Sequence, residues 1–207
     1  MHSFCTDYIV KDSKQKVPEQ QEGAKSDIKH VVDAISNDEA AHLYIRARKN
    51  LLSINQWQEL AGKLSARFTL IDPNGVEADR FPLQGDYIRI HLPTSTPNKY
   101  DWVRIEKIQD ENPDDYTGRI LIQVRPADPP LPQQETEHFF SREATSSFFV
   151  ERKGKRVSAM VRGRNELPNL DADNLVDKIR NAVIAIGAMA GLNVPQWKAL
   201  VKGILEK

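Results

Sequence analysis

Residues 145–191 read TSSFFVERKGKRVSAMVRGRNELPNLDADNLVDKIRNAVIAIGAMAG, and the spacing of their apolar positions changes part-way along. On either side of Lys153-Gly154 the apolar residues fall on every second position: Phe148, Val150, Val157, Ala159 and Val161. Side chains of a strand alternate between its two faces, and a glycine-containing pair between two such runs is typical of a hairpin turn. These residues therefore predict a β-hairpin with one apolar face.

The second half of this segment predicts a long amphipathic helix. Asp171-Ala172-Asp173-Asn174 supplies a helix cap and acidic residues in the first turn, where they favour the helix dipole. Apolar residues then recur at helical spacing, and Gly191 ends the helix: Leu175, Ile179, Val183 and Ile186. Because both apolar faces must be covered, we expect this helix to pack on the hairpin.

The chain before the hairpin predicts two helices followed by four strands. Asn37-Asp38-Glu39 begins the first helix, and Ser53 caps a second that carries Trp57. Segment 28–35 fits either a strand or a helix. Apolar residues with a period of two indicate strands over 68–71, 87–92, 100–108 and 119–125. In the third strand, alternation places Trp102, Arg104 and Glu106 on one face and Val103, Ile105 and Lys107 on the other.

The order of these elements predicts an α+β fold. It has an antiparallel sheet of about six strands, preceded by two helices and followed by the long amphipathic helix and a short C-terminal helix. This order resembles the helix-grip layout, in which a curved sheet wraps a terminal helix and leaves a cavity. We expect a flexible tail over 1–27 and a single domain over 28–207. The alternative is a small β-barrel over 66–125 joined to a separate helical and hairpin unit through the proline-rich segment 126–134.

Charge is balanced over the whole chain but not along it. The formal net charge is zero, whereas residues 141–207 hold 12 basic and 7 acidic side chains. A balanced total argues against a dedicated nucleic-acid binder, which normally carries a basic surplus, although a local basic face remains.

Other features of the composition indicate a soluble cytoplasmic protein. The single cysteine, Cys5, cannot form an intramolecular disulfide, and the first residues do not resemble a secretory signal. The longest apolar run, 182–192, spans only about 16 Å as a helix, which is too short for a bilayer. We therefore expect no membrane association.

Catalytic and cofactor motifs are missing from the sequence. It has no phosphate-binding glycine loop, nucleophile elbow, C-x-x-C or H-E-x-x-H pattern, and its five histidines are scattered singly. We therefore predict no catalytic residues, no metal site and no cofactor, and leave open whether the protein is an enzyme.

The densest positive charge lies on the hairpin and predicts a binding surface. Arg156, Arg162 and Arg164 have the same parity on one strand, so they share a face and could hold phosphates or carboxylates. We expect these three arginines to form the ligand- or partner-binding site of a non-catalytic binding or assembly module. Its partner would be an unknown anionic ligand or a protein. The alternatives are a nucleic-acid-associated protein and an enzyme or carrier that uses a cavity between sheet and helix. The oligomeric state is left open.

Overall fold

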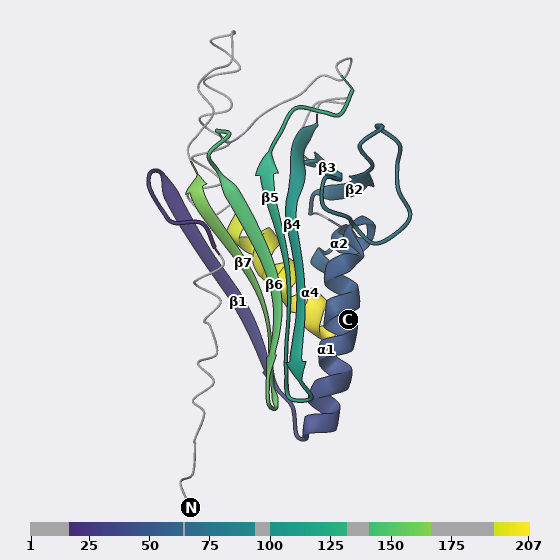
Figure 1. The fold of residues 1–207 in the computed structure, drawn as a ribbon, viewed down its shortest axis with the longest axis vertical. Coiled ribbons are helices and arrows are strands. Elements are labelled where there is room, and N and C mark those ends of the chain that lie inside the picture. Colours follow the sequence, from purple (N-terminus) through teal and green to yellow (C-terminus); the bar gives the residue numbers. More distant parts are fainter. Residues whose placement is uncertain (1–16, 64, 94–99, 132–140, 167–192) are drawn as a thin grey trace, which may run out of the picture.

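A computed structural model describes residues 17–63, 65–93, 100–131, 141–166 and 193–207 (Figure 1). Strand β1 (Ala24–Asp33) precedes helix α1 (Asn37–Leu52), the 3-10 turn η2 (Ile54–Gln56) and helix α2 (Trp57–Ala61). The remaining strands are β2 (Arg67–Ile71), β3 (Tyr87–His91), β4 (Asp101–Asp114), β5 (Thr117–Pro126), β6 (Thr145–Lys153) and β7 (Arg156–Glu166). Helix α4 (Asn193–Glu206) is the last described element.

The seven strands form one antiparallel sheet with the order β1-β7-β6-β5-β4-β3-β2. This confirms the predicted α+β class and the helix-grip order of elements. The undecided segment 28–35 lies mostly in β1, the additional strand, which pairs with β7 at one edge of the sheet. The barrel alternative is wrong, because β5 pairs directly with β6 across the proline-rich connection.

The predicted hairpin is confirmed in position and in the face that it buries. Lys153 pairs with Arg156, and Gly154 adopts a positive φ of 61° in the turn, a conformation that glycine reaches without strain. The alternating apolar residues of β6 and β7 lie in the main core together with the apolar face of α4: Phe148, Val150, Val157, Ala159, Val161, Leu200, Val201 and Ile204.

Helices α1 and α4 lie on the same face of the sheet, which we call the inner face; Figure 1 shows α4 crossing behind the strands. Trp57 is fully buried and donates its indole N–H to the Leu51 carbonyl at 3.0 Å. Its ring packs on Phe68 and Phe148, and the half-buried Trp197 of α4 packs on the same two rings. Helix and sheet are thus joined through a cluster of four aromatic rings.

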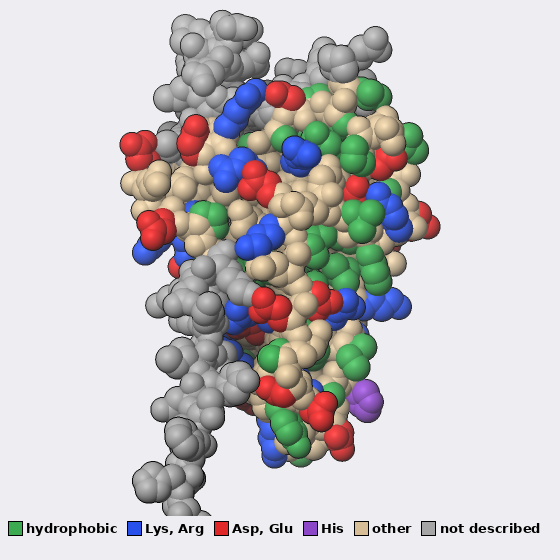
Figure 2. All heavy atoms as spheres, in the orientation of Figure 1, with side chains coloured by type: hydrophobic (Ala, Val, Ile, Leu, Met, Phe, Trp, Pro, Cys, Tyr) green, Lys and Arg blue, Asp and Glu red, His purple; other side chains and the backbone are tan. Residues whose placement is uncertain are grey.

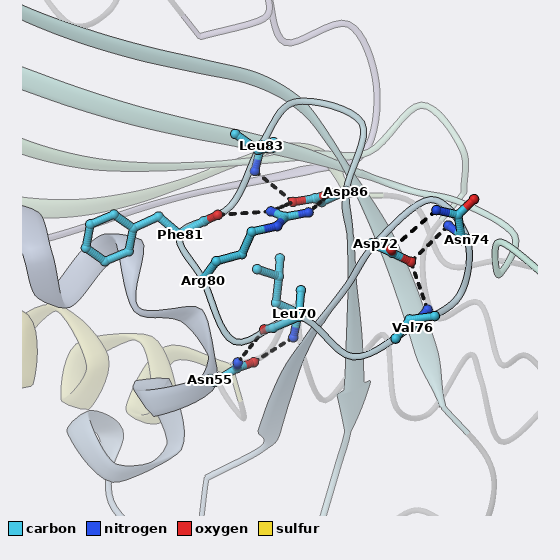
Figure 3. A network of polar contacts seen from close by, with 10 residues as sticks. Asn55, Leu70, Asp72, Asn74, Val76, Arg80, Phe81, Leu83 and Asp86 are labelled. Atoms are coloured by element: carbon cyan, nitrogen blue, oxygen red, sulfur yellow. Dashed lines mark hydrogen bonds and ion pairs between the residues drawn. The ribbon is translucent and has the colours of Figure 1, made fainter.

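Backbone and side-chain hydrogen bonds hold the long connection between β2 and β3 (Figure 3). The side chain of Asn55 in η2 accepts a hydrogen bond from the Leu70 amide and donates one to the Ala78 carbonyl. Asp72 stabilises the turn that follows it by accepting hydrogen bonds from the amides of Asn74 and Val76. The buried Asp86 accepts from the guanidinium of Arg80 at 2.6 and 3.0 Å, and from the Leu83 amide at 2.7 Å. These bonds fix a connection that carries three exposed apolar side chains, those of Val76, Phe81 and Leu83.

A bulge in β4 changes which face its residues occupy. The pairing with β5 shifts between Ile105 and Lys107, so that Lys107 lies opposite Gln123. The prediction that Lys107 shares a face with Ile105 is therefore wrong, because the extra residue reverses the alternation.

Two predictions fall wholly or partly outside the described residues. The amphipathic helix over 174–190, with its packing on the hairpin, lies outside them, and so does most of the 1–27 tail. Residues 21 and 22 are described, and both donate their amides to the Asn165 side chain. Within the described ranges, no helix is both long and apolar enough to cross a membrane.

Candidate anion-binding site

The face of the sheet opposite the helices, here called the outer face, carries a second and smaller apolar cluster. Leu121, Phe149 and Met160 are register partners on β5, β6 and β7, and each is almost completely buried. Val17 packs against them. The cluster forms an apolar row across the strands, and polar rows lie on both sides of it.

Four arginines lie beyond this apolar row, towards one end of the outer face. We call them the arginine band: Arg104 of β4, Arg125 of β5, and Arg162 and Arg164 of β7. Arg104 is the register partner of Arg125, and the β6 residues Thr145 and Ser147 pair with Arg164 and Arg162. Figure 2 views this face and shows several Lys and Arg side chains in its upper half, with acidic side chains beside them. The band draws on three strands: β4 and β5, which are consecutive, and β7, which comes about thirty residues later.

Two carboxylates make the described ion pairs within the band. Glu106 accepts from Arg125 at 2.8 Å, and Asp27 of β1 accepts from Arg164 at 2.7 Å. Asp27 also lies 3.6 Å from Arg162. Two further carboxyl groups interact electrostatically with the band, Glu143 with Arg125 and Glu166 with Arg164.

Arg162 is mostly buried yet has few acceptors. Its side chain is 13% exposed, its guanidinium lies 5.6 Å from the centre of the Phe149 ring, and Nη2 lies 3.8 Å from the Met160 sulfur. Nη1 is buried without a hydrogen-bond partner. A guanidinium has five N–H donors, so Arg162 keeps donors available for another acceptor.

Two hydroxyl groups beside Arg162 are also buried without a hydrogen-bond partner. Ser147 Oγ and Thr145 Oγ1 are buried, and neither has a hydrogen-bond partner. Ser147 is the register partner of Arg162, which places their Cβ atoms about 4.5–5.5 Å apart, and Thr145 lies two residues along the same face. Buried polar groups are normally hydrogen-bonded, so three unpaired groups in one place indicate a site for an acceptor.

The structure brings two of the three predicted site residues together. Arg162 and Arg164 belong to the band, whereas Arg156 lies at the opposite end of β7, about 26 Å from Arg164 along the strand. There Arg156 donates to Asp33 at 2.7 and 3.1 Å, both side chains being largely exposed. The hydrogen bond from Arg156 lowers the pKa of Asp33.

Sequence reasoning missed Arg104, Arg125, Thr145 and Ser147. Alternation along each strand gives the face of these residues, but the neighbours of a strand follow only from the sheet order. Arg104 and Arg125 are separated by a long hairpin, and the band becomes visible only when β4, β5, β6 and β7 are placed side by side.

Tyrosine rings adjoin the band on β3 and next to β4. The guanidinium of Arg104 lies 5.9 Å from the centre of the Tyr87 ring, and that of Arg89 lies 5.0 Å from the Tyr100 ring. Arginine over an aromatic face is a favourable cation–π arrangement.

Glu166 occupies the inner side of the same end of β7. Its carboxylate lies where a side chain at position 163 would be, so a larger residue there would displace it, and Ser26 Oγ is 3.4 Å away. Burial raises the pKa of Glu166, against the lowering effects of the Ser26 hydrogen bond and the charge of Arg164.

The side chains of this candidate site are mainly hydrogen-bond donors and cations. Within the described ranges, no group of three or more His, Cys, Asp or Glu side chains is placed to hold a metal ion. Ser147 has no hydrogen bond to a base that could activate it, and guanidinium groups do not act as bases at neutral pH. The site offers hydrogen-bond donors and positive charge.

No family model and no curated protein matches the chain. Among solved structures, the protein XoxI from Bacillus cereus is 12% identical, with 89% of this chain and 97% of that one covered at a TM-score of 0.46. Norcoclaurine synthase from Thalictrum flavum is 12% identical, with 92% and 99% covered and a TM-score of 0.42. Major latex-like protein 151 from Panax ginseng is 10% identical, with 83% and 98% covered and a TM-score of 0.39. Similarities of this size assign no ligand and no activity to this chain.

Proposed function

We propose that this protein is a non-catalytic binding module that holds an anionic partner on the arginine band. The observation that carries the proposal is the shared carboxylate of Asp27, which lies 2.7 Å from Arg164 and 3.6 Å from Arg162. Asp27 makes its shorter contact with Arg164, and Nη1 of Arg162 has no hydrogen-bond partner, so Arg162 keeps donors for an anionic partner. Arginine suits this role because its planar fork matches carboxylates and phosphates.

The position of the band supports binding without a large rearrangement. Its arginines project from β4, β5 and β7, which are hydrogen-bonded within one sheet and backed by the main core. Groups fixed on strands lose less conformational freedom on binding than groups on loops, which favours affinity.

A single-stranded nucleic acid is the second candidate partner. Tyr87 and Tyr100 lie beside Arg104 and Arg89, and bases stack on aromatic rings while phosphates pair with arginine. The balanced charge of the chain favours an acidic peptide or small anion over nucleic acid. The cavity alternative involves the segment 167–192, which is outside the described residues.

The test is charge reversal in the band with a matched control on the same face. Fluorescence anisotropy would follow binding of a labelled polyglutamate peptide and a labelled oligothymidylate at low and moderate salt. The double variant Arg104→Glu/Arg125→Glu should bind the preferred probe at least about tenfold more weakly, because two attractive charges become repulsive. The difference should be smaller at moderate salt, which screens these charges.

The control is the double variant Lys153→Glu/Arg156→Glu, two exposed register partners at the far end of the face; it makes the same charge change and should bind like the parent. Stronger binding of the oligothymidylate than of the peptide would favour the nucleic-acid candidate. Equal loss in the control and the band variant, or binding of neither probe by the parent, would refute the proposal.

A further inference from the structure

The unpaired polar groups on the outer face are concentrated in one place. The described residues contain seven buried side-chain atoms without a hydrogen-bond partner, and three of them belong to Thr145, Ser147 and Arg162. These residues are neighbours on β6 and β7, and the side chains of both hydroxyl residues are at least 99% buried. Leaving such groups unpaired is costly, so their grouping points to a missing acceptor.

The chemistry of the three groups defines what that acceptor is. Arg162 can only donate, and the two hydroxyls can each donate one hydrogen bond, so three donors can converge on one ligand. The charge of Arg162 favours a negative ligand, since Asp27 makes its shorter contact with Arg164.

The apolar side chains beside Arg162 favour an anion over water as the ligand. Phe149 and Met160 lie against Arg162 and belong to the buried outer cluster, so the guanidinium is in an apolar setting. In such surroundings, charge-assisted hydrogen bonds are stronger than in water. A neutral water would satisfy the hydroxyls but would add no negative charge beside Arg162, whose contact with Asp27 is 3.6 Å long.

We infer that Arg162, Ser147 and Thr145 form a pocket for a single oxyanion group, either a carboxylate or a phosphate. The inference rests on the proposed function and deepens it: the arginine band attracts an anionic partner, and this pocket holds one of its acidic groups. Arg104 and Arg125 lie outside the pocket and contribute charge.

The pocket is tested with small ions and the folded full-length chain. Melting temperatures are recorded with rising sodium phosphate or sodium acetate, against sodium chloride at matched ionic strength. A ligand that binds only the folded state raises the melting temperature. Phosphate or acetate should therefore stabilise the parent beyond chloride, and the stronger ion identifies the source of the oxyanion.

Two variants and one control locate the effect. Ser147→Ala should weaken apparent binding of the ion about tenfold, because a hydrogen bond to a charged ligand is lost. Arg162→Met should abolish the ion-specific increase, and Arg156→Met should keep it. If Arg162→Met does not fold, Ser147→Ala decides the question.

The outcomes separate this inference from the proposed function. If neither ion stabilises the parent beyond chloride, or if all variants respond equally, the pocket is refuted even when polyanions bind the band. If the pocket responds as expected but Arg104→Glu/Arg125→Glu binds polyanions like the parent, the proposed role of the band fails and the pocket stands.

Discussion

Arg162 and Arg164 lie on the same face of one strand but differ in how many of their hydrogen-bond donors have a partner. Arg164 donates to Asp27 at 2.7 Å and to the Ser26 carbonyl at 3.1 Å. Arg162 lies 3.6 Å from the same carboxylate and keeps a buried nitrogen without a partner. The available charge of the site thus depends on how a single aspartate on β1 is shared, which residue spacing does not reveal.

Glu166 should make the free energy of unfolding depend on pH. Burial raises its pKa above the ordinary value of 4.5, so the folded protein keeps this proton at pH values where the unfolded chain has lost it. Above pH 4.5 the folded state therefore binds more protons, and this group lowers the free energy of unfolding as pH rises through the raised pKa.

Replacing Glu166 by glutamine should therefore stabilise the protein in a pH-dependent way. Glutamine resembles the protonated acid and carries no charge to desolvate, so Glu166→Gln should melt higher than the parent at pH 7–8. The gap should close as pH falls below about 4.5, where the acid becomes protonated in both states. Thermal melts across this range check the prediction.

The matched control is Glu19→Gln, which removes an exposed carboxyl near the same end of β7. It should show no comparable pH-dependent gap. A Glu166→Gln protein that melts lower than the parent at pH 7–8 would mean that the carboxylate is stabilised by Ser26 and Arg164, contrary to the dominance of burial.

At the level of elements, α4 and α2 approach each other most closely at Gly203. A Cβ at this position would overlap the backbone carbonyl of Leu60, so glycine permits the contact between the two helices. Lys207 adds hydrogen bonds from its ammonium to the carbonyls of Glu59 and Leu60. The helix behind the sheet is thus positioned through backbone contact as well as apolar packing.

Gly203→Ala should destabilise the protein even though alanine favours helices. Intrinsic propensity alone would stabilise a helix by about 0.5–1 kcal/mol, whereas overpacking against a backbone atom costs about 1–3 kcal/mol. Chemical denaturation should therefore show a net loss, and Lys202→Ala at the exposed neighbouring position should be nearly neutral. A Gly203→Ala protein as stable as the parent would contradict this contact.

Elements with strong local signals could be predicted from the sequence. The hairpin of β6 and β7 has unbroken alternation and a glycine turn, and both its position and its buried face are confirmed. β1 could not be identified, because Ile28 is its only buried residue and its partner β7 lies over a hundred residues away. The bulge after Ile105 was equally invisible, since an extra residue in a strand leaves no local signature.

At the scale of the whole molecule, sheet order decides where the candidate site lies. β5, β6 and β7 are neighbours both in sequence and in the sheet, but β1 joins the other side of β7 and brings Asp27 to Arg162 and Arg164. That Arg162 and Arg164 share one face of a strand could be predicted. Their separation from Arg156 and their association with Arg104 and Arg125 required the three-dimensional order.

The most direct measurement of the central claim is a nuclear magnetic resonance titration that observes the arginine side chains themselves. Inorganic tripolyphosphate would be added to the isotope-labelled protein while the Nε–Hε signals are followed. The signals of Arg104, Arg125, Arg162 and Arg164 should shift together and saturate, whereas that of Arg156 should stay in place. A shift of Arg156 equal to that of the band, or no saturable shift in the band, would contradict the claim.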